Sequence, residues 1–172
     1  MVRFRDMTAD EFAAFRAWLV DDYASEIARN YRRNLDDARQ SSEQQTAELL
    51  PDGCATPNHL FLVLLDDSTS EPVGSLWCHM EPEKRRAFVY YIVIHEPHRR
   101  RGYGRSALMQ LEQLLTAREI DRLGLHVFGD NPGAQALYQE LGYRITGISM
   151  QKELATDERK GGGGRQPLGG TG

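Results

Sequence analysis

A cluster of arginines and glycines stands immediately before a predicted helix, and its residue types suit the binding of an anion. The stretch HRRRGYGR, residues 98–105, leads into an apolar pattern that predicts a helix over 105–118. The first N–H groups of a helix lack internal acceptors, the helix dipole is positive there, and glycine lets a ligand approach the backbone closely. The charged and small residues of the cluster are Arg99, Arg100, Arg101, Gly102, Gly104 and Arg105. The sequence therefore predicts a site for a phosphate or pyrophosphate.

The positive charge of this cluster is local, because the whole chain of 172 residues carries a formal net charge of −4. Domains that bind nucleic acid are usually basic, so a nucleic-acid binder built on HRRRGYGR is the least favoured interpretation. No apolar run approaches the ~18 residues that a membrane-spanning helix needs. We therefore expect a soluble protein that binds neither nucleic acid nor a membrane.

The two cysteines, Cys54 and Cys78, have no spacing that is typical of a metal site or a disulfide framework. We expect no metal, two free thiols and a reducing, cytoplasmic location. One globular domain is expected over residues 1–155, because domains usually have roughly 100–200 residues. Residues 156–172 contain GGGG and few apolar side chains, which indicates a flexible, glycine-rich tail.

The hydrophobic periodicity predicts the elements that must position the cluster. Thr8 and Glu11 form a capping-box pattern at the start of a first helix, and a polar second helix is expected to be buried only late, at Ala47, Leu49 and Leu50. Short turns between three consecutive strands imply antiparallel neighbours. The expected order is a strand at 2–5, helices at 9–27 and 34–50, strands at 59–65, 73–80 and 87–94, a helix at 105–118, a strand at 122–128, a helix at 131–141 and a strand at 144–154.

Two other phosphate-binding motifs fit the cluster less well. A Walker A loop is excluded because no Gly-Lys-Ser/Thr follows. The dinucleotide fingerprint G-x-G-x-x-G/A is met by Gly102, Gly104 and Ala107, but HEPHRR separates it from the preceding strand. A nucleotide-binding oxidoreductase is therefore kept only as an alternative.

The pattern Arg99-x-x-Gly102-x-Gly104, placed after YYIVI, resembles the pyrophosphate loop of the GCN5-related N-acetyltransferase (GNAT) family. The stretch NPGAQALYQELGY, residues 131–143, resembles the second motif of that family, and the order of the elements over about residues 2–154 is similar. The resemblance implies an α/β (α+β) fold. Its central sheet would be mixed and mostly antiparallel, with splayed parallel strands at the cofactor site and flanking helices.

The resemblance also implies a set of residues that bind acetyl-CoA as cosubstrate. Ile92, Val93 and Ile94 match the strand whose backbone binds pantetheine, the loop from Arg100 to Ser106 matches the pyrophosphate site, and Asn131 matches a hydrogen bond near pantetheine. The implied set is Ile92, Val93, Ile94, Arg99, Arg100, Arg101, Gly102, Tyr103, Gly104, Arg105, Ser106, Asn131 and Tyr138. Tyr138 matches the phenol near the thioester sulfur and is the implied catalytic residue.

Acetyl transfer to an amine requires a neutral nitrogen, a polarised carbonyl and a proton for the thiolate. A lysine-type amine has a pKa near 10.4, so it must first lose a proton. Tyr138 could protonate the sulfur, and a backbone N–H within 92–94 could stabilise the oxyanion. The base stays open among Glu81, Glu83, Glu96, His79 and His126 or water. Tyr90 and Tyr91 are candidates to line the acceptor site, but strand alternation predicts that they face opposite sides, one of them toward the core.

We interpret the chain as an acetyl-CoA-dependent N-acetyltransferase that works by direct transfer in a ternary complex. A cysteine nucleophile is disfavoured, because a cysteine in a strand is more often a small buried hydrophobe. The acceptor would be an amine of a small molecule or of a peptide, and a homodimer is compatible with this interpretation. The alternative from another class is a non-catalytic acyl-CoA sensor, which would bind the cofactor without transferring its acetyl group.

Overall fold

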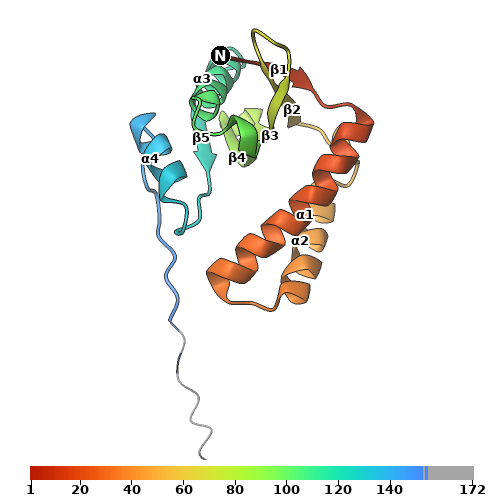
Figure 1. The fold of residues 1–172 in the computed structure, drawn as a ribbon, viewed down its shortest axis with the longest axis vertical. Coiled ribbons are helices and arrows are strands. Elements are labelled where there is room, and N and C mark those ends of the chain that lie inside the picture. Colours follow the sequence, from red (N-terminus) through yellow and green to blue (C-terminus); the bar gives the residue numbers. More distant parts are fainter. Residues whose placement is uncertain (153, 155–172) are drawn as a thin grey trace, which may run out of the picture.

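Five strands form one sheet in chain order in the computed structural model of the chain, which describes residues 1–152 and 154 (Figure 1). The strands are β1 (Val2–Asp6), β2 (His59–Asp66), β3 (Pro72–Glu81), β4 (Arg86–Ile94) and β5 (Arg122–Leu125). Neighbours from β1 to β4 are antiparallel, whereas β4 and β5 are parallel. The predicted mixed, mostly antiparallel sheet is confirmed.

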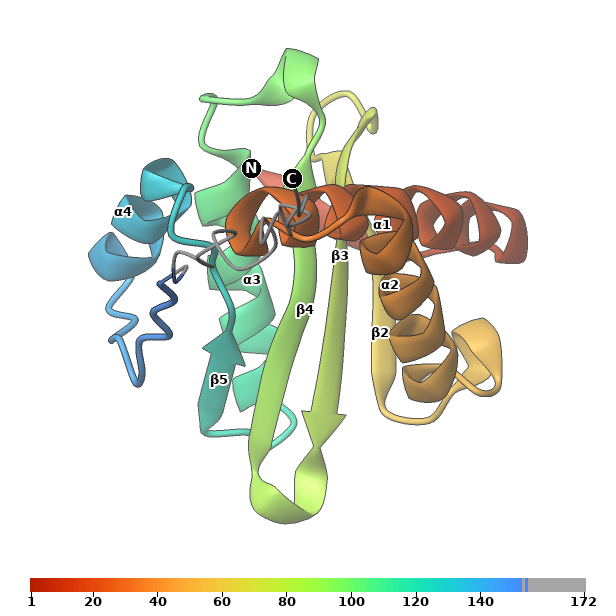
Figure 2. The ribbon, with the colours of Figure 1, turned by 90° about the horizontal axis from the view of Figure 1, so that it is seen from below.

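Helices cover both faces of this sheet. The helices are α1 (Ala9–Tyr31), α2 (Leu35–Leu49), α3 (Tyr103–Thr116) and α4 (Pro132–Glu140), with 3-10 turns η1 (Gly53–Ala55), η2 (Pro82–Lys84) and η3 (Glu96–His98). Figure 2 shows α1 and α2 crossing one face, with α3 behind the sheet and α4 beside β5. Within residues 1–152 and 154, no helix combines the length and apolar character that crossing a membrane requires.

The start of α1 has the predicted capping box. The Glu11 backbone N–H donates to the Thr8 hydroxyl (3.2 Å), and the Glu11 carboxylate accepts from the Thr8 N–H (2.8 Å). Together these contacts satisfy two N–H groups that the helix itself cannot satisfy. Arg5 of β1 pairs with the same carboxylate at 2.7 Å, so the cap also fixes α1 to the first strand.

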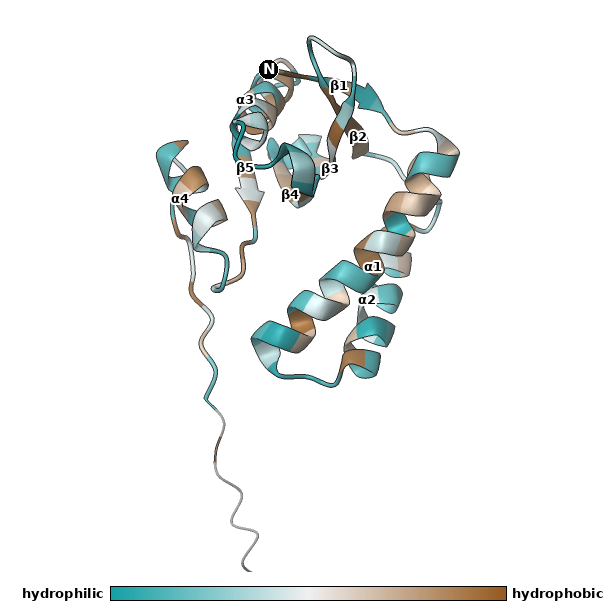
Figure 3. Cartoon of the chain, in the orientation of Figure 1, coloured by the Kyte–Doolittle hydropathy of each residue, from teal (hydrophilic) through white to brown (hydrophobic). Residues whose placement is uncertain are grey.

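The α2 helix packs through a different set of residues from the one predicted. Figure 3 shows α2 as mostly hydrophilic, yet a small buried residue recurs every four positions, at Ala38, Ser42 and Thr46. The Ser42 hydroxyl donates to the Val20 carbonyl of α1 (3.2 Å), which satisfies a buried polar group. Of the expected late contacts only Leu50 is buried, and Ala47 and Leu49 are exposed. That prediction was wrong because small residues let the two helices approach all along α2.

A β-bulge in β4 changes which side chains face each side of the sheet. Trp77 pairs with Tyr91 and Cys78 with Val89, so Tyr90 is an extra residue without a partner on β3. A bulge of this kind interrupts the alternation of side chains. Tyr90 and Tyr91 therefore both pack against the aromatic cluster under α1. The prediction that they face opposite sides was wrong, because the alternation rule holds only for an unbroken ladder.

The predicted last strand is absent from the described part of its range. Residues 144–152 and 154 have no regular secondary structure, and Ile145 and Ile148 are exposed by 69% and 77%. A strand requires a hydrogen-bonded neighbour, and this segment leaves α4 in a direction away from the sheet (Figure 1). The predicted strand at 122–128 is likewise shorter and ends at Leu125. The predicted tail at 156–172 lies outside the described residues.

Gly74 of β3 should be essential to the end of β4. An added Cβ at Gly74 would lie only 2.2 Å from the Val93 carbonyl oxygen, which is backbone and cannot move aside. We expect Gly74→Ala to lower the free energy of unfolding by about 1–3 kcal/mol, as overpacking does. The control is Gly129→Ala, because a Cβ there meets nothing within 4 Å. Denaturant unfolding measures both variants, and equal midpoints would contradict the prediction.

Candidate functional site

The parallel ladder between β4 and β5 is short, and the two strands part beyond it. Pairing runs from Arg86 with Arg122 to Val89 with Leu125, whereas β4 continues to Ile94. The sheet therefore opens beside the second half of β4, as the predicted splayed strands require.

The alternation of the antiparallel ladder shows which backbone groups face this opening. The His95 N–H donates to the Val73 carbonyl (2.9 Å), and Val93 lies opposite Ser75 in the same ladder. Alternate residues direct their backbone groups to the other side, so those of Ile92 and Ile94 face the opening. The Ile94 carbonyl accepts from Arg99 Nε there (3.0 Å), which agrees with this orientation. The N–H and C=O of Ile92 can therefore pair with an extended ligand that carries amide groups.

The N-terminus of α3 presents backbone amides to an anion. Gly102 is its N-cap in the left-handed conformation (φ 83°) and provides no side-chain cap. The Ser106 N–H donates to the Gly102 carbonyl (3.0 Å), so the amides of Tyr103, Gly104 and Arg105 precede the first bond within the helix. No described residue accepts from these three amides, which suits a phosphate oxygen.

Three of the four arginines in the cluster have partners within the chain. Arg99 donates to Ile94, the Arg101 guanidinium lies over the Tyr103 ring (5.6 Å to its centroid) and Arg105 pairs with Glu140 of α4. Within the described part of the chain, Arg100 has no such partner. Its Nη1 lies 3.9 Å from the position of an added Cβ on Gly133, at the start of α4. The cluster therefore offers a ligand the α3 amides and one uncommitted guanidinium.

Two predicted cofactor residues use their side chains to hold the loop in place. The Tyr103 ring is buried and its hydroxyl donates to Asp66 at the end of β2. The Ser106 hydroxyl accepts from the Val2 N–H of β1 (3.0 Å). These contacts fix α3 against the sheet, so Tyr103 can meet a ligand through its backbone.

A cavity of about 330 Å³ lies on the α1 side of the opening. Its walls come from α1, α2, the sheet, the segment after β5 and α4, and three residues of the predicted cofactor-binding set line it: Ile92, Asn131 and Tyr138. The lining of the cavity does not include Val93, Ile94 or residues 99–106. The Asn131 side chain accepts from the Ala134 N–H (3.1 Å) and caps α4. Asn131 thereby sets the direction of the helix that carries Tyr138.

Tyr138 has the environment of a phenol that stays protonated. Its side chain is half-buried, and burial raises its pKa. The ring lies 5.7 Å from the Tyr143 ring, which holds it against the end of α4. A protonated phenol at the wall of the cavity can donate a proton or a hydrogen bond to a bound group.

Of the five predicted base candidates, only His126 lines the cavity. Glu81 pairs with Lys84 (2.5 Å) and Arg86 (2.6 Å), and these hydrogen bonds lower its pKa to about 2. Glu83 and Glu96 are exposed outside the lining. His79 stacks on the ring of His59 (4.4 Å between centroids).

The histidines and aromatic rings of the sheet form one wall that continues into the cavity. The Trp77 indole N–H donates to His59 Nδ1 (2.8 Å), and Trp77 stacks on Tyr90 at 4.5 Å. Burial, and then the charge of His79, lower the pKa of His59 to about 4. His59 is therefore neutral near pH 7, and this wall is apolar and aromatic in character.

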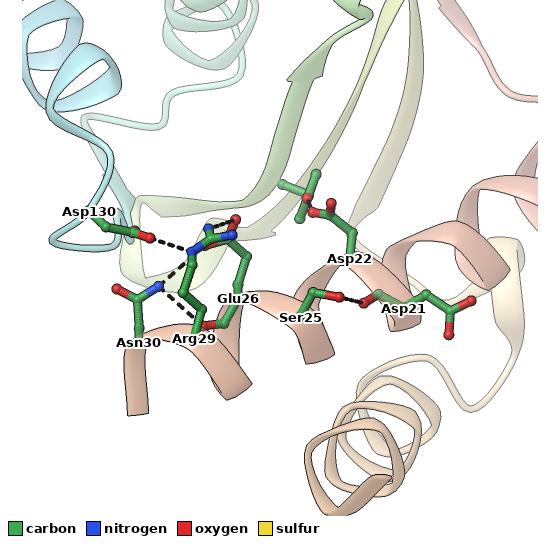
Figure 4. Close-up of polar contacts among 8 residues, drawn as sticks. Asp21, Asp22, Ser25, Glu26, Arg29, Asn30 and Asp130 are labelled. Carbon is green, nitrogen blue, oxygen red and sulfur yellow. Dashed lines mark hydrogen bonds and ion pairs between the residues drawn. The ribbon is translucent and has the colours of Figure 1, made fainter. Parts of the chain in front are cut away.

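Carboxylates of α1 also reach this site, and they are not among the residues predicted from the sequence. Glu26 lines the cavity, and Asp22 accepts a hydrogen bond from the Tyr91 hydroxyl. Figure 4 shows Asp22 pointing toward the strands, with Glu26 one turn further along. Burial, and then the charge of Glu26, raise the pKa of Asp22. In the sequence, Asp22 follows Leu19 of the apolar stripe by three residues, and this spacing is the only feature that indicates its place beside the buried face of α1.

An ion pair joins α1 to the segment between β5 and α4 at the edge of the cavity. Arg29 pairs with Asp130 (2.5 Å) and with Glu26 (2.6 Å), as Figure 4 shows. Tyr23 and Phe128 approach beside it, with ring centroids 6.2 Å apart. The cavity is therefore bounded on this side by contacts between segments far apart in the sequence.

Neither cysteine is placed or activated to act as a nucleophile in this cavity. Burial raises the pKa of Cys78 to about 12, so its thiolate is scarce near pH 7. Cys54 is exposed in η1 and outside the lining. Among the described residues there is also no cluster of three or more His, Cys, Asp or Glu that could hold a metal ion.

Comparison with known proteins identifies close relatives over most of the chain. The sequence profile described as "Acetyltransferase (GNAT) family" matches residues 13–143. The protein named "Uncharacterized N-acetyltransferase YycN" of Bacillus subtilis is 36% identical over 150 residues, which cover 86% of this chain and 96% of the relative. "Uncharacterized N-acetyltransferase YdgE" of the same species is 34% identical over 151 residues, covering 87% and 96%.

The crystal structure of Bacillus subtilis YycN has the same fold. It superposes with a TM-score of 0.86 at 34% sequence identity and covers 91% of this chain and 100% of that one. The predicted arrangement of sheet and helices is therefore shared with a solved relative.

Binding of acetyl-CoA should depend on the backbone of the cluster more than on any one arginine. A Cβ at Gly102 meets no atom within 4 Å, so the side chain of Gly102→Val would occupy the open space in front of the α3 amides, where an anion would bind. The substitution would also strain the backbone, because Gly102 has a positive φ. We expect a loss of affinity of at least about tenfold, or 1.4 kcal/mol. Arg100→Ala should lose less, because an exposed charge is screened by salt.

Calorimetry with acetyl-CoA measures this ranking. Gly142→Val is the matched control, because Gly142 also has a positive φ (90°) and open space but lies after α4. It should lower stability and leave the affinity intact. A larger loss in Arg100→Ala than in Gly102→Val would contradict the prediction.

Proposed function

We propose a specific activity for this chain, which belongs to the acetyltransferase (GNAT) family: it transfers the acetyl group of acetyl-CoA directly to an amine in a ternary complex. The observation that carries the proposal is the continuity of the site from the α3 amides to the cavity. An added Cβ on Gly104 would lie 3.8 Å from Ile94 of β4 and 3.5 Å from Leu137 of α4. The anion site thus adjoins both walls of the opening.

The residues along this path suit the successive parts of acetyl-CoA. The α3 amides and Arg100 would hold the pyrophosphate. The C=O of Ile92 and the N–H of Ile94 would pair with the amides of pantetheine, as an added strand does. Asn131 and Tyr138 would lie near the thioester, which supplies the activated acetyl group.

Transfer in this site would follow from the protonation states of the groups around the cavity. The neutral amine would attack the thioester carbon, and the Ile92 N–H would stabilise the developing oxyanion. A C–N bond forms as the C–S bond breaks, the departing thiolate would take a proton from Tyr138, and Tyr138 would regain a proton as the new amide nitrogen loses its second one. A ternary complex is favoured over an acetylated cysteine because Cys78 keeps its proton and Cys54 lies outside the cavity.

The acceptor in this proposal is an amine of a small molecule or of a peptide. A cytoplasmic location is part of the proposal and is supported by the use of only two cysteines, without a disulfide framework. Neither nucleic acid nor a membrane is included as a partner, and a homodimer is compatible with it.

An amine panel tests the proposal. The assay follows the release of free thiol from acetyl-CoA in the presence of small-molecule and peptide amines, with a reaction without amine as control. We expect release that depends on at least one amine. Acetyl-CoA binding without release for any amine would favour an acyl-CoA sensor. Calorimetric binding of NADH or DNA in place of acetyl-CoA would overturn the proposal.

Tyr138→Phe tests the proposed acid. The substitution keeps the ring and its packing, so affinity for acetyl-CoA should remain intact. Loss of a general acid should lower kcat and kcat/KM together by roughly 10²–10⁴-fold. A tyrosine that only stabilises the fold would lower the melting temperature by the loss of one hydroxyl and leave turnover unchanged. Kinetics, calorimetry and thermal unfolding on one preparation distinguish these outcomes.

A further inference from the structure

We propose that Tyr91 and Asp22 form the proton relay that deprotonates the acceptor amine. This inference rests on the proposed function and assigns the one chemical role there that is still without a residue. It is carried by the position of Tyr91 in the cavity and by its contact with a carboxylate on another element.

Tyr91 lies where an acceptor would meet the opening in the sheet. It lines the cavity and directly precedes Ile92, whose backbone faces the opening. The bulge at Tyr90 turns its side chain to the α1 face of the sheet. Phe15 and Trp18 of α1 hold its ring, with centroids 6.4 Å and 5.3 Å away. The ring of Tyr91 is therefore fixed in orientation at the wall of the cavity.

Asp22 lies behind Tyr91 and is the next group along a proton path. Its carboxylate accepts the hydrogen bond of the Tyr91 hydroxyl, and Asp22 itself is outside the cavity lining. An acceptor would therefore contact the tyrosine, and the carboxylate would act through it. Asp21, the adjacent acid, pairs with Arg39 of α2 at 2.9 Å and is 58% exposed.

The charges around Asp22 leave it more basic than an ordinary aspartate. Glu26 and Arg29 face it from α1, and Arg99 faces it from the loop before α3. Burial, followed by the charge of Glu26, raises the pKa of Asp22, and the two arginines offset only part of this rise. Arg29 is itself held by Glu26 and Asp130. A raised pKa narrows the gap to an ammonium group and eases the proton transfer.

The proposed step balances protons and bonds. The ammonium gives a proton to Tyr91 Oη while the Tyr91 proton passes to Asp22 Oδ2, which leaves a neutral amine, a neutral phenol and a protonated carboxyl. The amine then forms the C–N bond as the C–S bond breaks. Tyr138 protonates the thiolate and regains a proton as the new amide nitrogen loses its second one. Asp22 finally releases its proton to solvent.

Asp22→Asn, Tyr91→Phe and the control Asp21→Asn test the relay in kinetics against pH, with an acceptor from the amine panel. We expect Asp22→Asn and Tyr91→Phe to lower kcat/KM by roughly 10²–10⁴-fold near pH 7, as loss of a general base does. The deficit should shrink as the pH rises toward the amine pKa near 10.4, because the amine then loses its proton unaided. Asp21→Asn should behave like the unaltered protein, and all three should bind acetyl-CoA normally.

A purely structural role would give a loss of activity that is the same at every pH, and that result would overturn the relay. NMR titration of the carboxyl carbons gives a second readout without an acceptor. Asp22 should titrate above the ordinary aspartate pKa near 3.9, and a midpoint at or below that value would also overturn the relay. If the enzyme is active, a loss of activity that does not change with pH, or an Asp22 titration that is not shifted upward, rejects the relay alone. An amine panel without any product rejects the proposed function and the relay together.

Discussion

Tyr90, the extra residue of β4, is the point on which the arrangement of the site depends. It directly follows Val89, which pairs with Leu125 in the last rung of the parallel ladder. Up to that rung, β4 is an ordinary interior strand with hydrogen-bonded neighbours on both sides. Beyond it, the pairing with β3 continues but the pairing with β5 does not, so the N–H and C=O of Ile92 and the N–H of Ile94 have no strand partner on that side. If the ladder between β4 and β5 continued to Ile94, these backbone groups would be hydrogen-bonded to β5 and could not bind a ligand.

The two faces of the sheet then acquire different physical characters. On the α3 face, fully buried Ala107, Leu108 and Leu111 fix the helix, and the Ser106 contact with β1 fixes its first turn. Amide dipoles must be rigid to bind an anion without a cost of reorganisation. On the α1 face, the contact across the edge of the cavity depends partly on the exposed Arg29–Asp130 pair, which contributes little stability. The proposed cofactor side is thus rigidly built, and the proposed acceptor side is held more weakly.

The features that could be predicted from the sequence are those set by neighbouring residues. The capping box of Thr8 and Glu11 and the glycine turn at Gly102 each act within a few residues, so their spacing identified them. Tyr91 and Asp22 are 69 residues apart in the chain, and only the fold brings them together. The orientation of Tyr91 depends on the register between β3 and β4, which no local pattern encodes. The expected strand at 144–154 had suitable side chains, but a strand also requires a partner backbone.

The charges of the chain are separated across the cleft. The protein is acidic overall, with a formal net charge of −4, yet the proposed anion site needs no excess of arginine because backbone amides and the helix dipole supply positive potential. Arg99, Arg101 and Arg105 are used mainly to hold the loop and α4 in place. The α1 side carries Asp22 and Glu26, whose charges favour a cationic group. An anionic cosubstrate and a protonated amine would therefore be attracted to opposite walls of the cleft. The amine must lose its proton before it can attack, and in the proposed relay it does so at the α1 wall, whose carboxylates attract the ammonium group.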